Sequence, residues 1–485
     1  MGINTLFDIA NSAVTAQRLA IEVAGENIAN VNTPGYSRQQ VVMQNRPVTT
    51  SNGFALGTGV EIQAVRRSYD GMLQQQIVDG NSTYQQNLAR QSALEQIQPS
   101  FNEVATDGLG KALDNFFGAW QDLSTNPAGT AERQALLSRS QVLVDTFSQM
   151  SNSLTSVSKV ANDNLIGITA DVTGNAASLA LVNTQILSTQ AVGGNPNELL
   201  DQRDLLLQKI SEKVGITSKL ESDGTATVKL AGGETLVSEG KYATLYTNAV
   251  TPPTNNILLS GLGYPPPVKN PATDTDVSGT VGGAGNSLGE MGGTLAVRDS
   301  IVPGYLNKLN ELASKLVTAV NAQQSIGYGI DGPPATTGHN FFNPAGVTSA
   351  TIALDPALSA AKIAAGLPTA TDPIPTSTGN NANALLIAAI QKDSTLAFST
   401  GSDSFAGFYN SMVSTVGIDT QAAQNTTTQG AAFLKQLGTL KSSNSGVSLD
   451  EELTNLLKYQ QAFQGAAKVI TTATTMLDTI LGLVR

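Results

Sequence analysis

SLDEELTNLLKYQQAFQGAAKVITTATTMLDTILGLV, residues 448–484, is the stretch that decides the fold of this chain. Apolar residues recur in it at alternating steps of four and three, the repeat of a helix that packs lengthwise along a partner helix. Ser448 and Glu451 have the spacing of a capping box, and Asp450 lies in the first turn, where the helix dipole favours an acid. The predicted seam consists of Leu449, Leu453, Leu456, Gln460, Phe463, Ala467, Ile470, Thr474, Leu477, Leu481 and Val484.

The first 31 residues carry the same repeat at the other end of the chain. Asn4 or Thr5 can cap the start of this helix, and Pro34-Gly35 ends it. The predicted N-terminal seam consists of Ile3, Phe7, Ala10, Val14, Gln17, Ile21, Ala24, Ile28 and Val31.

Periodicity alone leaves two interpretations of these helices open. They are either ordinary core helices or seams that seek a partner helix, and their position at chain ends, which usually fray, favours the second. Gln17 and Gln460 lie near the middle of the two seams. Each fits a buried residue that fixes register or a partly exposed side chain.

Composition excludes several functions. Only 13% of the 485 residues are charged, the net charge is −11 and there is no cysteine. Disulfides, thiolate chemistry and cysteine-bound metals are therefore excluded, and the acidic balance argues against nucleic acid and anionic membranes as partners. No apolar run is long enough to span a bilayer, and the N-terminus lacks the features of a cleavable signal peptide. The abundant neutral polar residues suit packing against copies of the same surface.

The interior predicts helices around a β-rich segment. Residues 46–80 are predicted as an extended linker, although helical periodicity already begins at Tyr69 and runs to Leu94. Alternation from Ile216 to Tyr246, with turns at 223–224 and 232–233, indicates strands and hairpins. Further helices are expected at 109–122, 131–153, 156–190, 197–212, 294–324, 383–391 and 405–439.

The fold class expected is mainly α with an inserted β domain, in a multidomain rod whose two ends lie at its base. The β segment is expected at the far end of this rod, and a short strand near 351–354. The expected domains are 1–45 with 448–485 as paired terminal coiled-coil helices, 46–80 as linker, 81–213 with 293–325 and 380–447 as an inner helical bundle, 214–292 as an outer β-rich insert, and 326–379 as a loop-rich segment packed on the inner domain.

Residues that could carry chemistry are few, and we assign no catalytic, cofactor-binding or metal-binding residue. His339 is the only histidine, so neither a histidine-based triad nor an HExxH zinc site can be built. LLDQRD (199–204) is expected to form salt bridges along its own helix, and LDEEL (449–453) to serve in capping. Trp120 is expected to anchor the inner helical core. The sequence therefore predicts no enzyme and no cofactor.

Three segments near the chain ends resemble the rod, hook and hook-associated family of flagellar axial proteins. These are IANVNTPGYSRQ (28–39), GTGVEIQAVRRSYD (57–70) and the helix within 445–481. Interior segments at 126–140, 194–216, 292–321 and 379–390 resemble the hook-associated members, which lie where hook and filament join. Residues 251–290 and 326–378 are only loosely similar. The motif carried over is Asn32, Thr33, Pro34, Gly35 and Tyr36.

The resemblance implies a structural, self-assembling subunit that serves motility. It implies export through the flagellar type III system, a passage through the cytoplasm, and an extracellular place at the hook–filament junction. The implied partners are further copies of the chain, the hook protein, a second junction protein of the hook-associated family, and a cytoplasmic export chaperone that binds the C-terminal helix. We also expect largely disordered termini before assembly.

Two alternatives remain at this point. The chain could be another axial subunit, of flagellin or rod type, or its central insert could hold a secreted enzyme or an adhesin. The organism, the number of subunits in a ring and any ligand of the insert do not follow from the sequence.

Overall fold

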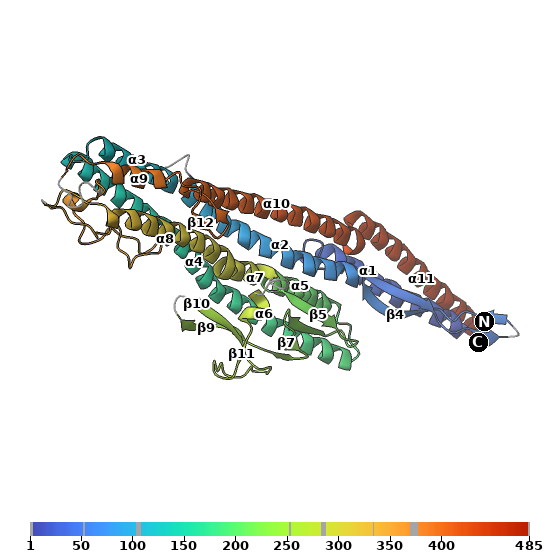
Figure 1. Cartoon of the computed structure of the whole chain (residues 1–485). Helices are drawn as coiled ribbons and strands as arrows, with labels where there is room; N and C mark the ends of the chain where they lie inside the picture. Colours follow the sequence, from blue (N-terminus) through green and yellow to red (C-terminus); the bar gives the residue numbers. More distant parts are fainter. Residues whose placement is uncertain are drawn as a thin grey trace.

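The computed structural model describes residues 3–51, 54–102, 108–251, 254–282, 288–332, 334–368 and 377–483. The molecule is an elongated rod (Figure 1), with both chain termini at one end and α3 and α9 near the other. α1 (Ile3–Ala29) and α11 (Leu449–Leu483) run antiparallel at the terminal end, as the repeats at the two chain ends predict. Val484 lies outside the described residues.

A pair of strands covers one side of α1. β1 (Gln39–Asn45) and β4 (Val60–Arg67) are antiparallel, with β2 (Thr49–Ser51) and β3 (Phe54–Leu56) between them along the chain. The assignment of residues 39–45 to the terminal helices was therefore wrong: the chain turns after Pro34-Gly35, and QQVVMQN favours a strand through its valines. The linker also ends earlier than residue 80. α2 (Gly71–Ile97) begins where Asp70 accepts hydrogen bonds from the backbone N–H groups of Met72 and Leu73.

Long helices make up the body of the rod. The segments 131–153 and 156–190, expected as two helices, form one, because neither Pro nor Gly interrupts the chain between them. The helix expected from residue 294 is instead divided by the π-helical turn η2 (Val297–Ile301), because Pro303 lacks an N–H and its ring clashes with the carbonyl four residues back. The body helices are α3 (Leu109–Thr125), α4 (Thr130–Ala191), α5 (Asn197–Lys213), α7 (Gly289–Ala296), α8 (Val302–Ile326), α9 (Ala382–Ile390) and α10 (Phe405–Ser445), with the short helices η1 (Gln98–Phe101), α6 (Ser278–Gly282) and η3 (Ala360–Lys362).

An aromatic core fills the end of the rod that lies away from the termini. Trp120 is completely buried, as its predicted anchoring role requires, and its ring lies 5.3 Å from that of Phe341. Phe341 and Phe342 bring the loop-rich segment 326–379 onto the helices, where Asn321 Oδ1 accepts both of their backbone N–H groups. The strand expected near 351–354 is reduced to a single bridge between Phe342 and Leu354.

Arg133 fastens the same segment to the start of α4. Its side chain is buried and donates hydrogen bonds to the carbonyl oxygens of Pro127, Ala360 and Ile363. Burial lowers the pKa of the guanidinium to about 10. The three carbonyls replace the water that the cation loses on burial.

The strands of the central segment share a core with the helices. Apolar residues on the second half of α4, such as Val172 and Leu179, pack with Val228, Leu236 and Ile257 from the strands. The hairpin turns expected at 223–224 and 232–233 are confirmed. The strands are β5 (Ile216–Leu220), β6 (Ala226–Leu230), β7 (Thr235–Ser238) and β8 (Lys241–Tyr242) in one sheet, and β9 (Leu245–Thr251), β10 (Thr254–Leu259) and β11 (Thr275–Asp276) in another, while β12 (Ala397–Phe398) and β13 (Gly401–Ser402) pair separately.

The position of these sheets corrects the expected order along the rod. They lie along the flank of the helical body, whereas α3, α9 and the described residues of the segment 326–379 occupy the far end (Figure 1). The reason is that α4 is long enough to belong to both cores. By length and composition α4 could also cross a membrane, but many of its apolar side chains, such as Leu143, Phe147, Leu165 and Leu179, are buried in these two cores.

A glycine allows a close contact between α2 and α7. A Cβ atom on Gly293 would lie 2.4 Å from the backbone oxygen of Gln86. We predict that Gly293→Ala separates the two helices and lowers the free energy of unfolding by about 1–3 kcal/mol. Gly174→Ala is the control, because nothing lies near that position inside α4, and it should stabilise by about 0.5–1 kcal/mol. Urea unfolding followed by circular dichroism compares the two, and equal effects would contradict the packing described.

Candidate functional site: the terminal helix pair and its root

The face that α1 buries is rotated from the predicted seam. Of the nine predicted positions, only Ala10 and Ala24 are buried, and the other seven are half-buried. Residues on adjacent faces of the helix, namely Ala16, Ala20 and Asn27, are buried instead. The cause is that α1 has two partners, α11 on one side and the β1–β4 pair on the other. Half-buried predicted positions are Ile3, Phe7, Val14, Gln17, Ile21, Ile28 and Val31.

The predicted seam of α11 divides into two groups. The line nearest α1 contains Glu452 and Ala473, which are buried, and Leu456, Phe463, Ala467 and Ile470 beside it are half-buried. The remaining described positions of the predicted seam, Leu449, Leu453, Gln460, Thr474, Leu477 and Leu481, are exposed.

Much of the apolar surface of α11 is therefore left uncovered by the chain itself. Leu453 and Leu481 are 51% and 59% exposed. Because Glu452 contacts Asn27 and both helices rise equally per residue, α1 begins opposite about residue 476 of α11, and the part beyond has no α1 alongside. We call Leu449, Leu453, Leu457, Met476, Leu477, Ile480 and Leu481 the uncovered residues of α11. Exposed apolar groups of this kind mark interaction surfaces.

Asn27 holds the inner end of α1 to the chain that follows it. Its Oδ1 accepts hydrogen bonds from the hydroxyl of Tyr36 and the backbone N–H of Gln39, both at 2.9 Å. Its Nδ2 donates to the Gln39 carbonyl at 2.9 Å and to Glu452 Oε2 at 3.2 Å. The fully buried amide therefore joins α1, β1 and α11.

The motif at residues 32–36 forms the turn between α1 and β1. Asn32, Thr33 and Pro34 are exposed, and Gly35 adopts φ 85°, a conformation that favours glycine. Tyr36 points back to Asn27, and burial together with the charge of Glu26 raises the pKa of its hydroxyl. The motif thus positions the residues that follow it.

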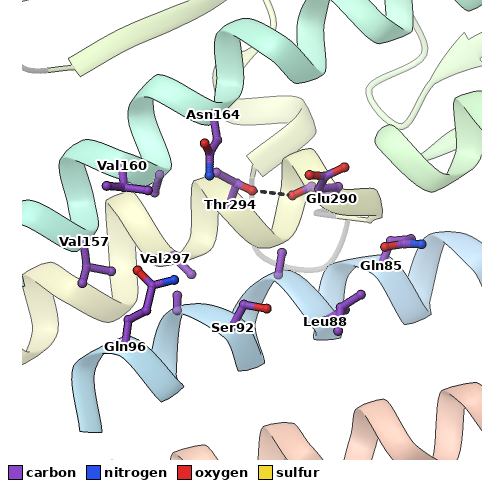
Figure 2. A pocket seen from close by; sticks show the side chains of 13 residues that line it. Gln85, Leu88, Ser92, Gln96, Val157, Val160, Asn164, Glu290, Thr294 and Val297 are labelled. Atoms are coloured by element: carbon purple, nitrogen blue, oxygen red, sulfur yellow. Dashed lines mark hydrogen bonds between the residues drawn. The ribbon is translucent and has the colours of Figure 1, made fainter. Parts of the chain in front are cut away.

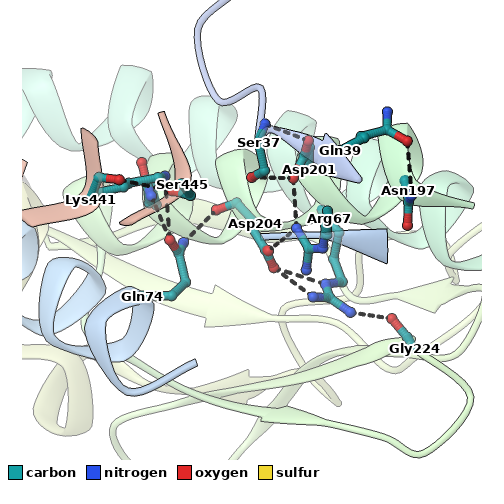
Figure 3. Close-up of polar contacts among 12 residues, drawn as sticks. Ser37, Gln39, Arg67, Gln74, Asn197, Asp201, Asp204, Gly224, Lys441 and Ser445 are labelled. Atoms are coloured by element: carbon teal, nitrogen blue, oxygen red, sulfur yellow. Dashed lines mark hydrogen bonds and ion pairs between the residues drawn. The ribbon is translucent and has the colours of Figure 1, made fainter. Parts of the chain in front are cut away.

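Asp201 and Asp204 connect this turn and β4 to the body (Figure 3). Asp201 accepts hydrogen bonds from the backbone N–H and the hydroxyl of Ser37, at 2.8 and 2.7 Å. Arg67 Nη1 lies 2.7 Å from a carboxylate oxygen of each aspartate, and Arg203 also binds Asp204. Burial disfavours the charge on Arg67, but the two carboxylates outweigh this and raise the pKa of its guanidinium. Salt bridges at i,i+3 and i,i+4 within 199–204 are thus not what forms; the aspartates face outward from α5 toward β4.

Arg38 makes a second ion-pair group at the start of α11. Its Nε lies 2.7 Å from Glu452 Oε1 and its Nη1 lies 2.9 Å from Glu451 Oε2. The sequence predicted a capping role for these glutamates and did not predict their ion pairs with Arg38. No local sequence pattern indicates these ion pairs, because Arg38 and Arg67 lie far from their acidic partners along the chain.

Two features of the described part of the chain bear on possible chemistry, its potential metal ligands and its hollows. None of its histidine and acidic residues forms a group of three or more that could hold a metal ion. A hollow of about 260 Å³ lies between α2, α4 and α7 (Figure 2). Glu290, which lines it, is already paired with Lys213 at 2.7 Å, and the hydroxyl of Thr294 donates to the Glu290 backbone carbonyl.

Family comparisons match both ends and the middle of the chain. Residues 7–36 match the flagella basal body rod protein family, and residues 438–483 match the C-terminal family of the flagellar basal body rod proteins FlgE, FlgF and FlgG. The two ends, α1 with the turn that follows it and α11 with the residues that precede it, therefore have the sequence features of a flagellar axial subunit. Residues 94–342 match the helical domain of flagellar hook-associated protein FlgK, and this match covers more than half of the chain. The chain belongs to the FlgK family of flagellar hook-associated proteins.

Relatives agree over nearly the full length. Flagellar hook-associated protein 1 of Bacillus subtilis is 27% identical, with 99% of this chain and 97% of the relative covered. The proteins of the same name from Salmonella typhimurium and Escherichia coli are each 26% identical, with 99% of this chain and 100% of the relative covered. The solved structure of the flagellar hook junction protein FlgK from Burkholderia pseudomallei has the same fold, with a TM-score of 0.66 at 16% identity, covering 76% of this chain and all of that one.

We call residues 27–39, 60–70 and 445–455, where the terminal helices join the body, the root of the helix pair. Replacement of Asn27 tests how this root is held together. Asn27→Ala removes four hydrogen bonds and leaves the partners buried, so amide exchange should rise about tenfold or more at residues 36–41 and 449–455. Asn32→Ala is the control, because that side chain is exposed and makes no hydrogen bond among the described residues. Exchange measured by mass spectrometry decides, and similar profiles for the two variants would refute the role of Asn27.

Proposed function

We propose that this chain is a structural subunit that adds at the distal end of the flagellar hook and forms the junction between hook and filament. Membership in the FlgK family supports a location in the flagellum. The proposed role in assembly rests on one observation, the exposed apolar residues of α11. The apolar residues of α11 that α1 leaves uncovered need a partner outside the chain. Burying them between subunits would supply a large part of the assembly free energy.

The partners proposed follow from this surface. Neighbouring copies cover the uncovered residues of α11 in the assembled ring, and the hook protein and a second hook-associated protein lie on either side of it. Before assembly, a cytoplasmic export chaperone covers the same helix while the chain passes through the type III system to the outside. The two predicted seams, Gln17 and Gln460 included, then lie within this assembled zone.

The domain roles are part of the same proposal. The terminal helices and the β1–β4 pair form the inner layer of the tube, and the helices of the body form its wall. The flank with β5–β11 faces outward. The chain then acts through shape and contact, without catalysis and without a cofactor. No observation on the described residues favours a flagellin, a rod subunit, an enzyme or an adhesin instead.

The distal part of α11 offers a sharp test. Leu477→Asp with Leu481→Asp places two carboxylates where a neighbouring subunit is expected, and burying them unpaired costs several kcal/mol. We expect a subunit that is absent from the hook tip, and cells that do not swim. Antibody labelling of isolated hook–basal bodies, viewed by electron microscopy, locates the subunit.

The matched control adds the same charge to polar positions of the same turns. Thr475 and Thr479 are exposed, and Thr475→Asp with Thr479→Asp should leave labelling at the distal end of the hook. Swimming cells with labelled hook tips in the leucine variant would overturn the assembly role of α11. Wild-type labelling elsewhere on the flagellum would overturn the proposed junction.

A further inference from the structure

The chain passes twice between the terminal end, formed by α1, α11 and the β1–β4 pair, and the body. Both connecting segments, which we call crossings, lie beside Arg38. The crossings are residues 68–70, between β4 and α2, and residues 446–448, between α10 and α11. Arg38 is bonded at both. Its carbonyl accepts from the Ser68 N–H at 2.8 Å, and its backbone N–H donates at 2.9 Å to the carbonyl of Ser445, the residue directly before the second crossing. The Ser68 hydroxyl also donates to the Asn444 carbonyl at 2.8 Å.

Buried ion pairs surround these crossings. Arg67, Asp201 and Asp204 are each less than a tenth exposed, and Asp201 and Asp204 lie three residues apart on one face of α5. The guanidinium of Arg67 also lies 4.1 Å from the centre of the Tyr69 ring. Arg203 extends the group by donating to the Gly224 carbonyl in the turn between β5 and β6 (Figure 3).

Polar groups from α2 and α10 close the other side of this cluster. Gln74 Nε2 donates to the Asp204 carbonyl at 3.2 Å, and its Oε1 accepts from Lys441 at 3.5 Å. Burial lowers the pKa of the Lys441 ammonium. Six segments therefore meet here: β4, the turn before β1, α5, α2, α10 and the turn between β5 and β6.

The distal parts of the terminal helices have no buried ion pair among the described residues, although the Val60 N–H of β4 donates to the Ser12 hydroxyl of α1 at 3.2 Å. Within the described residues, the ion pair of α1 outside its root is Arg18–Glu22, which joins two exposed side chains of the same helix. Beyond its root, α11 contacts α1 through small or half-buried side chains, and only Ala473 is buried. Contacts of this kind are broken one turn at a time.

The root behaves differently, because its charges depend on one another. If β4 moved away from α5, Asp201 would remain buried without a cationic partner and Asp204 would keep only Arg203. An unpaired buried charge costs far more than the pair contributes. Withdrawal of Arg38 would likewise leave the Glu452 carboxylate buried beside Asn27 without a cationic partner. The root is therefore stable only with both ion-pair groups intact.

We propose that Arg67 with Asp201 and Asp204, and Arg38 with Glu451 and Glu452, form a root latch. This latch holds residues 27–39, 60–70 and 445–455 on the body as one cooperative unit. The distal parts, 3–20 and 460–483, open and close independently in the free subunit. The latch fixes the direction in which both terminal helices leave the body before any partner is present. It is a property of the free chain and stands whether or not the proposed assembly role is correct.

Hydrogen exchange followed by mass spectrometry on the purified full-length chain tests the latch. In the wild type, the three root segments should exchange slowly and the distal parts fast. In Arg67→Gln, exchange should rise about 100-fold or more in all three root segments together, including residues 445–455, which Arg67 does not bond. Peptides of α3 and α8 should keep their wild-type rates.

Two further variants make the result decisive. Arg67→Lys keeps the charge without the planar fork and should give a smaller increase over the same segments. Arg139→Gln removes an exposed ion pair with Asp122 and should change none of them. If Arg67→Gln also raises hydrogen exchange in α8, the body has been disturbed, and the milder Arg67→Lys variant replaces it in the test. The criterion stays the same: exchange must rise in all three root segments together while α3 and α8 keep their wild-type rates. An increase confined to residues 60–70, or wild-type roots that exchange as fast as the distal parts, would overturn the proposal.

Discussion

One helix packed against one antiparallel neighbour can bury only part of an apolar surface, and this limit determines the organisation of the terminal end. α11 has apolar residues on more than one side, but α1 covers a single line that runs through Glu452 and Ala473. The β1–β4 pair could have covered more, yet it packs on α1. The chain therefore completes its terminal end only with a partner, which is the property that a self-assembling subunit requires.

The body supplies the rigid base for this incomplete end. α4 is continuous from residue 130 to residue 191, so the aromatic core of the far end and the shared helix–sheet core cannot move independently. α5 extends from the shared core to the root and presents Asp201 and Asp204 to the terminal part. Forces on the terminal helices would thus reach the body through buried ion pairs, whose separation is costly, rather than through a flexible linker.

Local patterns predicted what local forces determine. The 3.5-residue repeat and the breaker at Pro34-Gly35 correctly predicted the terminal helices, and the hairpin turns of the central segment correctly predicted the strands β5 to β7. The repeat did not identify the buried line of α1, because that line depends on β strands folded from residues 39–67. LLDQRD had the spacing of helical salt bridges, but its aspartates bind Arg67, which lies 134 residues earlier than Asp201. Long-range partners of this kind leave no periodic signal in a single sequence. The family resemblance predicted the hook-associated class, which the family match confirms, while the roles of individual seam residues remain predictions.

The central claim is that the uncovered residues of α11 are covered by other subunits in the flagellum. The chain has no cysteine, so Leu481→Cys provides a single reactive thiol at one of these residues. Its rate of reaction with a maleimide can be measured in the free subunit and in isolated hook–basal bodies that contain the variant. The account predicts fast labelling of the free subunit and strong protection in the assembled structure. Equal labelling rates in the two states would contradict it.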